Sequence, residues 1–179
     1  SAVSDVYKGQ AKRHIHFQMN GDGAVNLTPP DLSLWPKTVW KPEELAIKVN
    51  LDELTDKDKE GWKIGQNLLL TGKILTARDA AHKRLNDLAK NHMPLPSGLS
   101  LKGKFLYYVG PVDPVGNEVV GPAGPTTATR MDKYTDTILS HYGVTGMIGK
   151  AERGDDAIRS IKENKAVYLV AVGGAAFLV

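Results

Sequence analysis

The 179-residue chain is long enough for one domain with a sizeable core, and its lack of cysteine excludes disulfides and any thiolate metal or iron–sulfur site made by this chain alone. Its net charge of +3, from 23 Lys and Arg against 20 Asp and Glu, comes without a basic run, so we expect no nucleic-acid partner. No apolar run reaches the length of a membrane span and Ser1–Asp5 is not a signal peptide, so we expect a soluble protein that is neither secreted nor bound to a membrane.

Alternating apolar and polar residues on either side of the glycine-rich turn 20–23 predict a β-hairpin over residues 12–27. His14 and His16 share one face of its first strand, where two imidazoles could bind a metal ion. No third ligand is near them in the sequence, so we favour a solvated strand face.

Residues 29–42 contain four prolines, which preclude a long helix or a central strand. Trp35 and Trp40 lie between these prolines and are expected to clamp the segment onto its own domain or onto a partner. A short strand is expected at residues 46–49, and a loop or short helix at residues 51–60.

An apolar run with internal glycines spans residues 64–75 and predicts one bent, buried strand. Thr76 and Asp79, three residues apart, have the spacing of a capping box at the start of a helix. That helix is expected to end before Pro94. Its apolar face comprises Ala81, Leu85, Leu88 and Ala89.

Arg78 is an unusual residue for the first turn of a helix, because a cation there opposes the helix dipole by about 0.3–1 kcal/mol. It could pair with an acidic neighbour, or it could bind a ligand anion together with the free N–H groups, and local chemistry leaves both open. His82 follows four residues later on the same helix face, where a structural hydrogen bond is favoured over a catalytic role.

The second half of the chain alternates between strand and helix patterns. Strands are expected at residues 104–109, 144–148 and 166–172, and helices at residues 131–142 and 155–164. The last helix is expected to bury Ala157, Ile158 and Ile161. This alternation predicts an α/β fold with a largely parallel sheet and helices packed on it, and the β-leaning first part predicts a second β layer.

Residues 121–130 form a glycine- and proline-rich stretch that leads into a helix. Glycine lets a ligand approach the backbone, and the free N–H groups and dipole of a helix N-terminus favour an anion. Thr126 and Arg130 of this stretch, like Arg78 and Lys150, fall at strand-to-helix junctions, where the sites of open α/β sheets gather. Three of the four are cations, so an anion with more than one charge is expected.

A purely structural interpretation of these positions stays open. Thr126 could be only an N-cap, Arg130 a surface cation and Lys150 a strand-end charge. Dinucleotide-binding, Walker and serine-hydrolase motifs are absent from the sequence, and helix capping explains the paired carboxylates Asp155–Asp156.

Three motifs, in this order, resemble the C-terminal (β) domain of class I fumarate hydratases: Thr71–Leu85 (TGKILTARDAAHKRL), Gly121–Met131 (GPAGPTTATRM) and Gly149–Lys150. They fall within residues 60–179. The closely related β subunit of L-tartrate dehydratase is the second match. Those subunits tend to carry cysteines where this chain has Ala77 and Ala81, which favours the fumarase side.

The resemblance implies an α/β fold of the swivelling β/β/α type, in three layers. The catalytic β domain would comprise residues 61–179, and residues 1–60 would form an N-terminal linker and hairpin extension packed on it. The family's domain normally continues past the glycine-rich strand end, so its last strands are expected to be missing here or to lie on another piece. The family also often has a glycine directly after its lysine, where this chain has Ala151.

The implied activity is the reversible hydration of fumarate to (S)-malate. Arg78, Thr126, Arg130 and Lys150 would bind the dianionic substrate. Thr126 would act in proton transfer with a carboxylate of the α domain, and Lys150 would stabilise the aci-carboxylate charge. The family's [4Fe-4S] cluster would be bound by a cysteine-bearing α domain or subunit and not by this chain, which would be inactive alone.

The resemblance also implies a homodimer of the full enzyme, in the cytoplasm or in mitochondria. Two alternatives stay open. The chain could be the β subunit of an L-tartrate dehydratase, or a non-catalytic anion-binding or assembly module on the same scaffold, because a fold does not determine a function.

Overall fold

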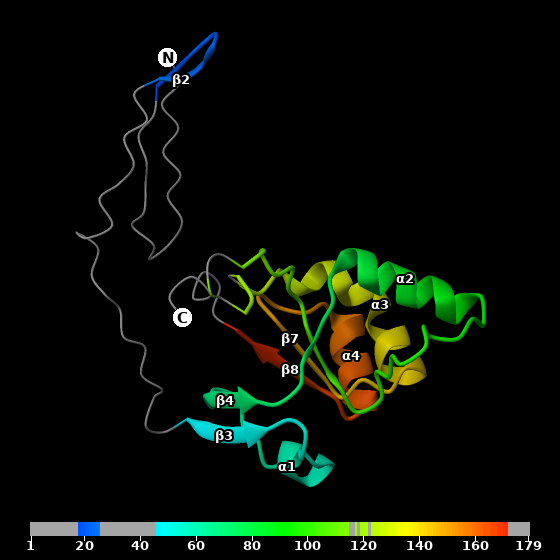
Figure 1. The fold of residues 1–179 in the computed structure, drawn as a ribbon. Coiled ribbons are helices and arrows are strands. Elements are labelled where there is room, and N and C mark those ends of the chain that lie inside the picture. Colours follow the sequence, from blue (N-terminus) through cyan, green and yellow to red (C-terminus); the bar gives the residue numbers. More distant parts are fainter. Residues whose placement is uncertain (1–17, 26–45, 115–116, 118, 122, 172–179) are drawn as a thin grey trace. The chain divides into compact units, whose positions relative to one another are not determined.

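The computed structural model describes residues 18–25, 46–114, 117, 119–121 and 123–171 (Figure 1). Residues 18–25 belong to one compact unit, and the described residues from Ala46 to Ala171 belong to another. Among the described residues, no helix is both long enough and apolar enough to cross a membrane.

The first unit contains a β-hairpin. Strand β1 (Gln18–Asn20) pairs antiparallel with β2 (Gly23–Val25), and Asn20 opposes Gly23 across the turn. The predicted hairpin is therefore confirmed at its tip. His14, His16, Trp35 and Trp40 lie outside the described residues.

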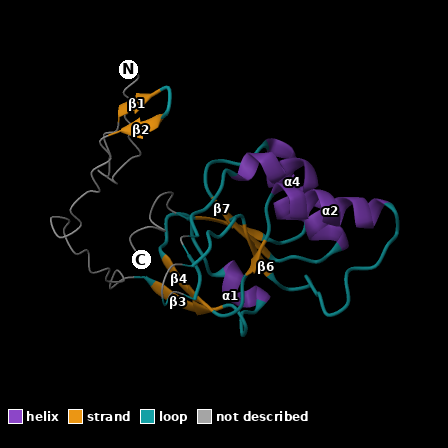
Figure 2. Cartoon of the chain, turned by 45° about the horizontal axis from the view of Figure 1, so that its top comes forward, coloured by secondary structure: helices purple, strands orange, loops and turns teal. Residues whose placement is uncertain are grey.

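The second unit is built on a four-stranded sheet in the order β5-β6-β7-β8. Its two central strands, β6 and β7, are labelled in Figure 2. Its strands are β5 (Leu75–Thr76), β6 (Phe105–Tyr107), β7 (Gly146–Gly149) and β8 (Val167–Val170). All three pairings are parallel. The strand–helix alternation of the sequence thus predicted the sheet correctly, because parallel neighbours need crossover connections between them.

Helices cover one face of this sheet (Figure 1). They are α2 (Asp79–Lys90), α4 (Asp155–Glu163) and a composite stretch of a 3-10 turn η2 (Ala128–Met131), α3 (Asp132–Asp136) and a π-helical turn η3 (Thr137–His141). The helix expected at residues 131–142 buries one face of this composite stretch, with Tyr134 half-buried and the following residues buried: Met131, Thr135, Ile138, Leu139 and Tyr142. Gly143 ends it with a φ of +68°, a conformation that suits glycine.

A second, two-stranded parallel sheet packs on the other face. It pairs β3 (Ile47–Asn50) with β4 (Leu68–Thr71), and the short helix α1 (Asp56–Glu60) connects them. Phe105 and Ile148 of the main sheet pack against Val49, whereas their neighbours Leu106 and Met147 join the helix-side core. This alternation divides the unit into β, β and α layers, and the predicted three-layer α/β fold is confirmed.

The prediction of one bent, buried strand over residues 64–75 is wrong. The run forms β4 and β5, which belong to different sheets, and Gly72 breaks the chain between them with a φ of +106°. A Cβ at Gly72 would lie 3.1 Å from Asp52 N and from Asn50 Oδ1, so this crossing requires glycine. Ile64 is exposed and Leu68 is half-buried.

Two further predictions about helices are wrong. Helix α2 has Arg78 as its N-cap with no side-chain capping bond, so Thr76 and Asp79 do not form a capping box. Ile158 of α4 is 52% exposed, and Ser160 is buried in its place. The capping box of this chain lies instead at α1, between Thr55 and Asp58. The predicted boundary after residue 60 stays a prediction, although β3, which precedes it, pairs with β4, which follows it.

Candidate active site

The candidate site lies at the carboxyl ends of β6 and β7, where the segment Thr126–Ala128 runs between the two strands. Thr126 N donates to the carbonyl of Tyr108 at 2.7 Å, and Lys150 N donates to that of Thr126 at 3.1 Å. Ala128 N in turn donates to the carbonyl of Lys150 at 3.0 Å, within a parallel bridge between Thr127 and Lys150. The structure therefore brings Thr126 and Lys150 into adjacent, hydrogen-bonded positions.

These hydrogen bonds use two of the backbone amides of the glycine- and proline-rich stretch 121–130. The amides of Thr126 and Ala128 bond to protein carbonyls, so neither is free for a ligand. Thr127, not Thr126, is the N-cap of η2, and its side chain makes no capping bond. The anion site expected at this stretch stays a prediction, with two of its backbone amides already bonded to protein carbonyls.

Arg130 connects two of the predicted residues through its guanidinium group. Its Nη2 donates to Thr126 Oγ1 at 2.8 Å and to Asp79 Oδ2 at 3.0 Å. Arg78 Nε lies 3.9 Å from the same Asp79 oxygen. The acidic neighbour considered for Arg78 is thus present, while the side chains of Arg78 and Arg130 each remain 51% exposed.

Sequence analysis missed Asp79 as a member of the site. Its position directly after Arg78, at the first residue of α2, was interpreted as a capping signal. The structure instead places its carboxylate beside two guanidinium groups, that of the adjacent Arg78 and that of Arg130, which follows Asp79 by 51 residues. No local pattern in the sequence reveals such a contact.

Arg78 also contacts the chain just after β6, at Gly110. A Cβ at Gly110 would lie 3.0 Å from Arg78 Nη1, so the guanidinium packs directly over this glycine backbone. The four predicted residues therefore lie near the carboxyl ends of the strands of the main sheet, as their strand-to-helix positions predicted. They are Arg78, Thr126, Arg130 and Lys150. Their roles toward a ligand stay predictions.

Lys150 is exposed, and the described residues include no carboxylate within ion-pair distance of it. The next residue, Ala151, has a φ of +66°, in the left-handed region that favours glycine. The family's frequent glycine at this place has a physical reason here, because the chain keeps the glycine-type conformation with an alanine.

We expect Ala151→Gly to stabilise the protein by up to about 1 kcal/mol, because glycine adopts this φ without the steric cost that Cβ imposes. Urea unfolding measures the change. Ala81→Gly, inside helix α2, is the matched control and should destabilise by roughly 0.5–1 kcal/mol. Destabilisation by both substitutions would contradict the assigned strain.

His82 is fully buried behind the site, which agrees with the favoured structural role. Its Nδ1 lies 2.9 Å from the carbonyl of Arg78, and its ring stacks edge-on against Tyr108 at 5.1 Å. Its Nε2 is buried without a hydrogen-bond partner among the described residues. Burial lowers the pKa of His82, so the folded state holds the neutral ring.

This burial predicts a loss of stability in acid. Below the ordinary histidine pKa of about 6.5, the unfolded chain binds a proton that the folded chain does not, so the free energy of unfolding falls as the pH falls. The slope contributed by one such group is at most about 1.4 kcal/mol per pH unit. Urea unfolding between pH 7.5 and 5.5 should show a smaller slope in His82→Asn than in the wild type. An equal reduction in His141→Asn, at an exposed histidine, would contradict the assignment.

The part of the chain that the structure describes offers no set of ligands for a metal cluster. The sequence has no cysteine, and no group of three or more metal-binding side chains occurs among the described residues. The candidate side chains are half-exposed on an open edge. A hollow of about 630 Å³ lies beside α2 and is lined mainly by apolar residues. None of the four candidate residues, Arg78, Thr126, Arg130 and Lys150, lines it. The four candidate side chains therefore lie outside this hollow.

Comparison with known proteins shows similarity to one family. A family model described as "Fumarase C-terminus" matches residues 21–179. "Fumarate hydratase class I, anaerobic" of Escherichia coli (strain K12) is 35% identical over 134 residues, which cover 73% of this chain and 24% of that protein. "Fumarate hydratase 2" of Leishmania major is 33% identical over 134 residues, which cover 73% of this chain and 23% of that protein.

A shorter relative matches over most of its own length. "Putative L(+)-tartrate dehydratase subunit beta" of Methanocaldococcus jannaschii is 31% identical over 134 residues, which cover 74% of this chain and 68% of that protein. The chain thus spans about a quarter of the two fumarate hydratases, at 24% and 23%, but two thirds of a protein named as a separate β subunit.

Proposed function

The chain belongs to the fumarase C-terminal family of class I hydro-lyases, and from this membership we propose that it supplies the substrate-binding wall of an enzyme that reversibly hydrates fumarate to (S)-malate. The observation that carries the proposal is the contact of 2.8 Å between Arg130 Nη2 and Thr126 Oγ1, beside Arg78 and Lys150. It joins a guanidinium, a group whose geometry suits a carboxylate, to the hydroxyl to which we assign proton transfer.

Substrate binding would use the cations of this edge. Arg78 and Arg130 present planar guanidinium groups, which bind carboxylates through two parallel hydrogen bonds. Asp79 already occupies one nitrogen of Arg130, Nη2, and so orients the group while its other N–H donors remain for the substrate. Two arginines and Lys150 suit a dianion with a carboxylate at each end.

Thr126 would carry the proton that moves to or from the carbon of the substrate. A free threonine hydroxyl is a poor acid and a poor base, so it needs help at both steps. The guanidinium of Arg130 stabilises the alkoxide when the proton has left, because its Nη2 donates directly to that oxygen. A carboxylate of the α part would return or remove the proton, and Lys150 would stabilise the negative charge on the nearby carboxylate.

This chain has no cysteine to bind the family's [4Fe-4S] cluster. We place the cluster in a cysteine-bearing α part that joins this chain. The relative named as a β subunit supports a partner of this kind.

A second candidate is the dehydration of L-tartrate. It is supported by the relative from Methanocaldococcus jannaschii, of which the chain covers 68%. Ala77 is buried and Ala81 half-buried, at the places where tartrate dehydratase β subunits tend to carry cysteines. Because both side chains are methyl groups, we favour fumarate.

A substrate panel tests the choice. The chain is assembled with its α part under anaerobic conditions, the iron content is measured, and fumarate, (S)-malate and L-tartrate are offered at equal concentrations. Turnover of fumarate and malate with little turnover of tartrate would support the proposal. Preference for tartrate would move the assignment to the second candidate, and a complete lack of turnover with the cluster intact would leave an anion-binding or assembly module.

A further inference from the structure

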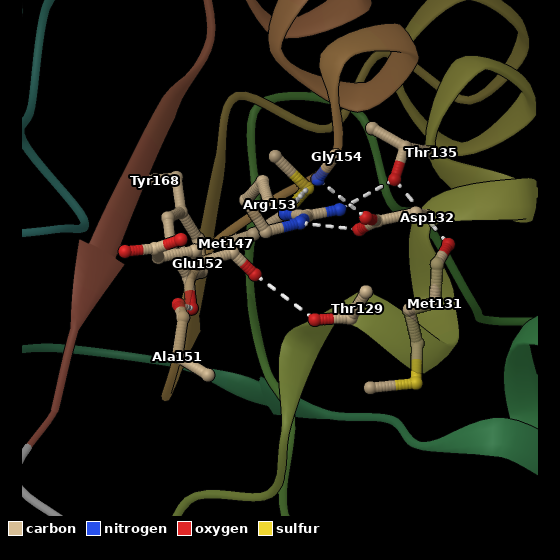
Figure 3. Close-up of polar contacts among 10 residues, drawn as sticks. All are labelled: Thr129, Met131, Asp132, Thr135, Met147, Ala151, Glu152, Arg153, Gly154 and Tyr168. Atoms are coloured by element: carbon tan, nitrogen blue, oxygen red, sulfur yellow. Dashed lines mark hydrogen bonds and ion pairs between the residues drawn. The ribbon is translucent and has the colours of Figure 1, made fainter.

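Arg153 is a buried arginine next to the proposed site, and its side chain is only 2% exposed. Figure 3 shows its polar contacts. Its Nε donates to Asp132 Oδ1 at 2.6 Å, and its Nη2 donates to Thr135 Oγ1 at 2.5 Å. Its guanidinium carbon also lies 4.9 Å from the ring centre of Tyr168 and 5.6 Å from that of Tyr108. A buried charge is stable only when it is paired in this way, so these contacts fix its position.

These contacts connect the two segments that carry the site. Asp132 and Thr135 belong to α3, which directly follows the turn that bears Arg130. Arg153 belongs to the loop 150–154, which begins at Lys150. Asp132 binds the loop at two points, because its Oδ1 accepts from Arg153 and its Oδ2 accepts from Gly154 N at 2.7 Å.

Further hydrogen bonds hold the loop from both sides (Figure 3). Thr129 Oγ1 donates to the carbonyl of Glu152 at 3.0 Å, and Tyr168 OH donates to that of Ala151 at 2.9 Å. These bonds hold Ala151 in its left-handed conformation, with a φ of +66°, directly after Lys150. A non-glycine residue in this conformation is strained, so the loop keeps its geometry only while these hydrogen bonds are present.

We propose that Arg153 is a positioning residue, which holds the loop 150–154 against α3 and so fixes Lys150 relative to Thr126 and Arg130. This inference depends on the proposed function, because it concerns the same site. Arg153 itself is buried and touches no substrate; it acts through Lys150. Lysine cannot replace it, because a single ammonium group cannot reproduce the guanidinium's fork of donors toward Asp132 and Thr135.

A double-mutant cycle in the assembled enzyme tests the inference. Arg153→Lys should lower kcat/KM for fumarate by about 10²-fold, because misplacement of a catalytic group by about 1 Å costs this much. In a Lys150→Met background the same substitution should have almost no further effect, since the group that it positions is already gone. A merely smaller folded fraction would instead reduce both backgrounds equally. Arg159→Lys, at an exposed arginine of α4, is the matched control and should leave kcat/KM unchanged.

Tyr168→Phe is a milder second variant for the case that Arg153→Lys does not fold. It removes the hydrogen bond to the carbonyl of Ala151 and keeps the ring beside Arg153, and it should show the same dependence on Lys150. If Tyr168→Phe lowered kcat/KM by the same factor in the wild-type and the Lys150→Met backgrounds, while the wild-type enzyme is active, the positioning role would be overturned. A wild-type complex with an intact cluster and no turnover would instead overturn the proposed function.

Discussion

Arg130→Ala in the assembled enzyme should lower kcat/KM for fumarate by on the order of 10³-fold. The substitution removes a guanidinium to which we assign substrate carboxylate binding, and it also removes the donor that lies 2.8 Å from Thr126 Oγ1. Both kcat and KM should change, because one lost interaction concerns substrate binding and the other concerns the charge that develops during proton transfer. Steady-state kinetics with fumarate and with malate measure the two effects.

The fold should survive this change. The ion pair between Arg130 and Asp79 is half-exposed, and exposed pairs contribute only about 0–1 kcal/mol to stability. The thermal transition of Arg130→Ala should therefore stay close to that of Arg84→Ala, at an exposed arginine of α2. A collapsed transition in Arg130→Ala alone would show that Arg130 is structural.

Gly146→Ala should destabilise the protein by about 3 kcal/mol or more. Gly146 opposes Phe105 in the central strand pair, and a Cβ there would lie 2.1 Å from Phe105 Cε1. Phe105 is itself buried between the two sheets, so its ring has no room to move aside. Urea unfolding measures the loss.

Gly61→Ala is the control for this prediction, because its backbone has a φ of −77° and the nearest contact of a Cβ is an ordinary 3.4 Å. Adding Phe105→Leu to Gly146→Ala should recover part of the lost stability, since it removes the ring atoms that clash. A Gly146→Ala protein as stable as Gly61→Ala would contradict the packing of the central pair.

Features set by local periodicity could be predicted from the sequence. The stripe from Met131 to Tyr142, the parallel sheet and the hairpin tip all follow from spacing that neighbouring residues impose. The convergence of Arg78, Thr126 and Lys150 at one edge followed from the rule that parallel strands end together.

Features set by distant contacts could not be predicted. Gly72 separates two sheets because the chain crosses close to Asn50 and Asp52, which no local pattern shows. Arg153 lies between Glu152 and Gly154 in sequence and has the surroundings of an exposed loop residue, yet Asp132 and two tyrosine rings bury it. Ile158 is exposed although it continues an apolar pattern, because the inner face of α4 is filled by Ala157 and Ser160.

We propose that this chain completes the active site of an iron–sulfur hydro-lyase. The most direct test adds the chain stepwise to its α part, with the cluster intact, and follows the absorbance of fumarate. We predict that the α part alone is inactive, and that fumarate disappears at a rate that rises with the added chain until the α part is saturated. A stable complex that forms without any change in fumarate absorbance would contradict the claim.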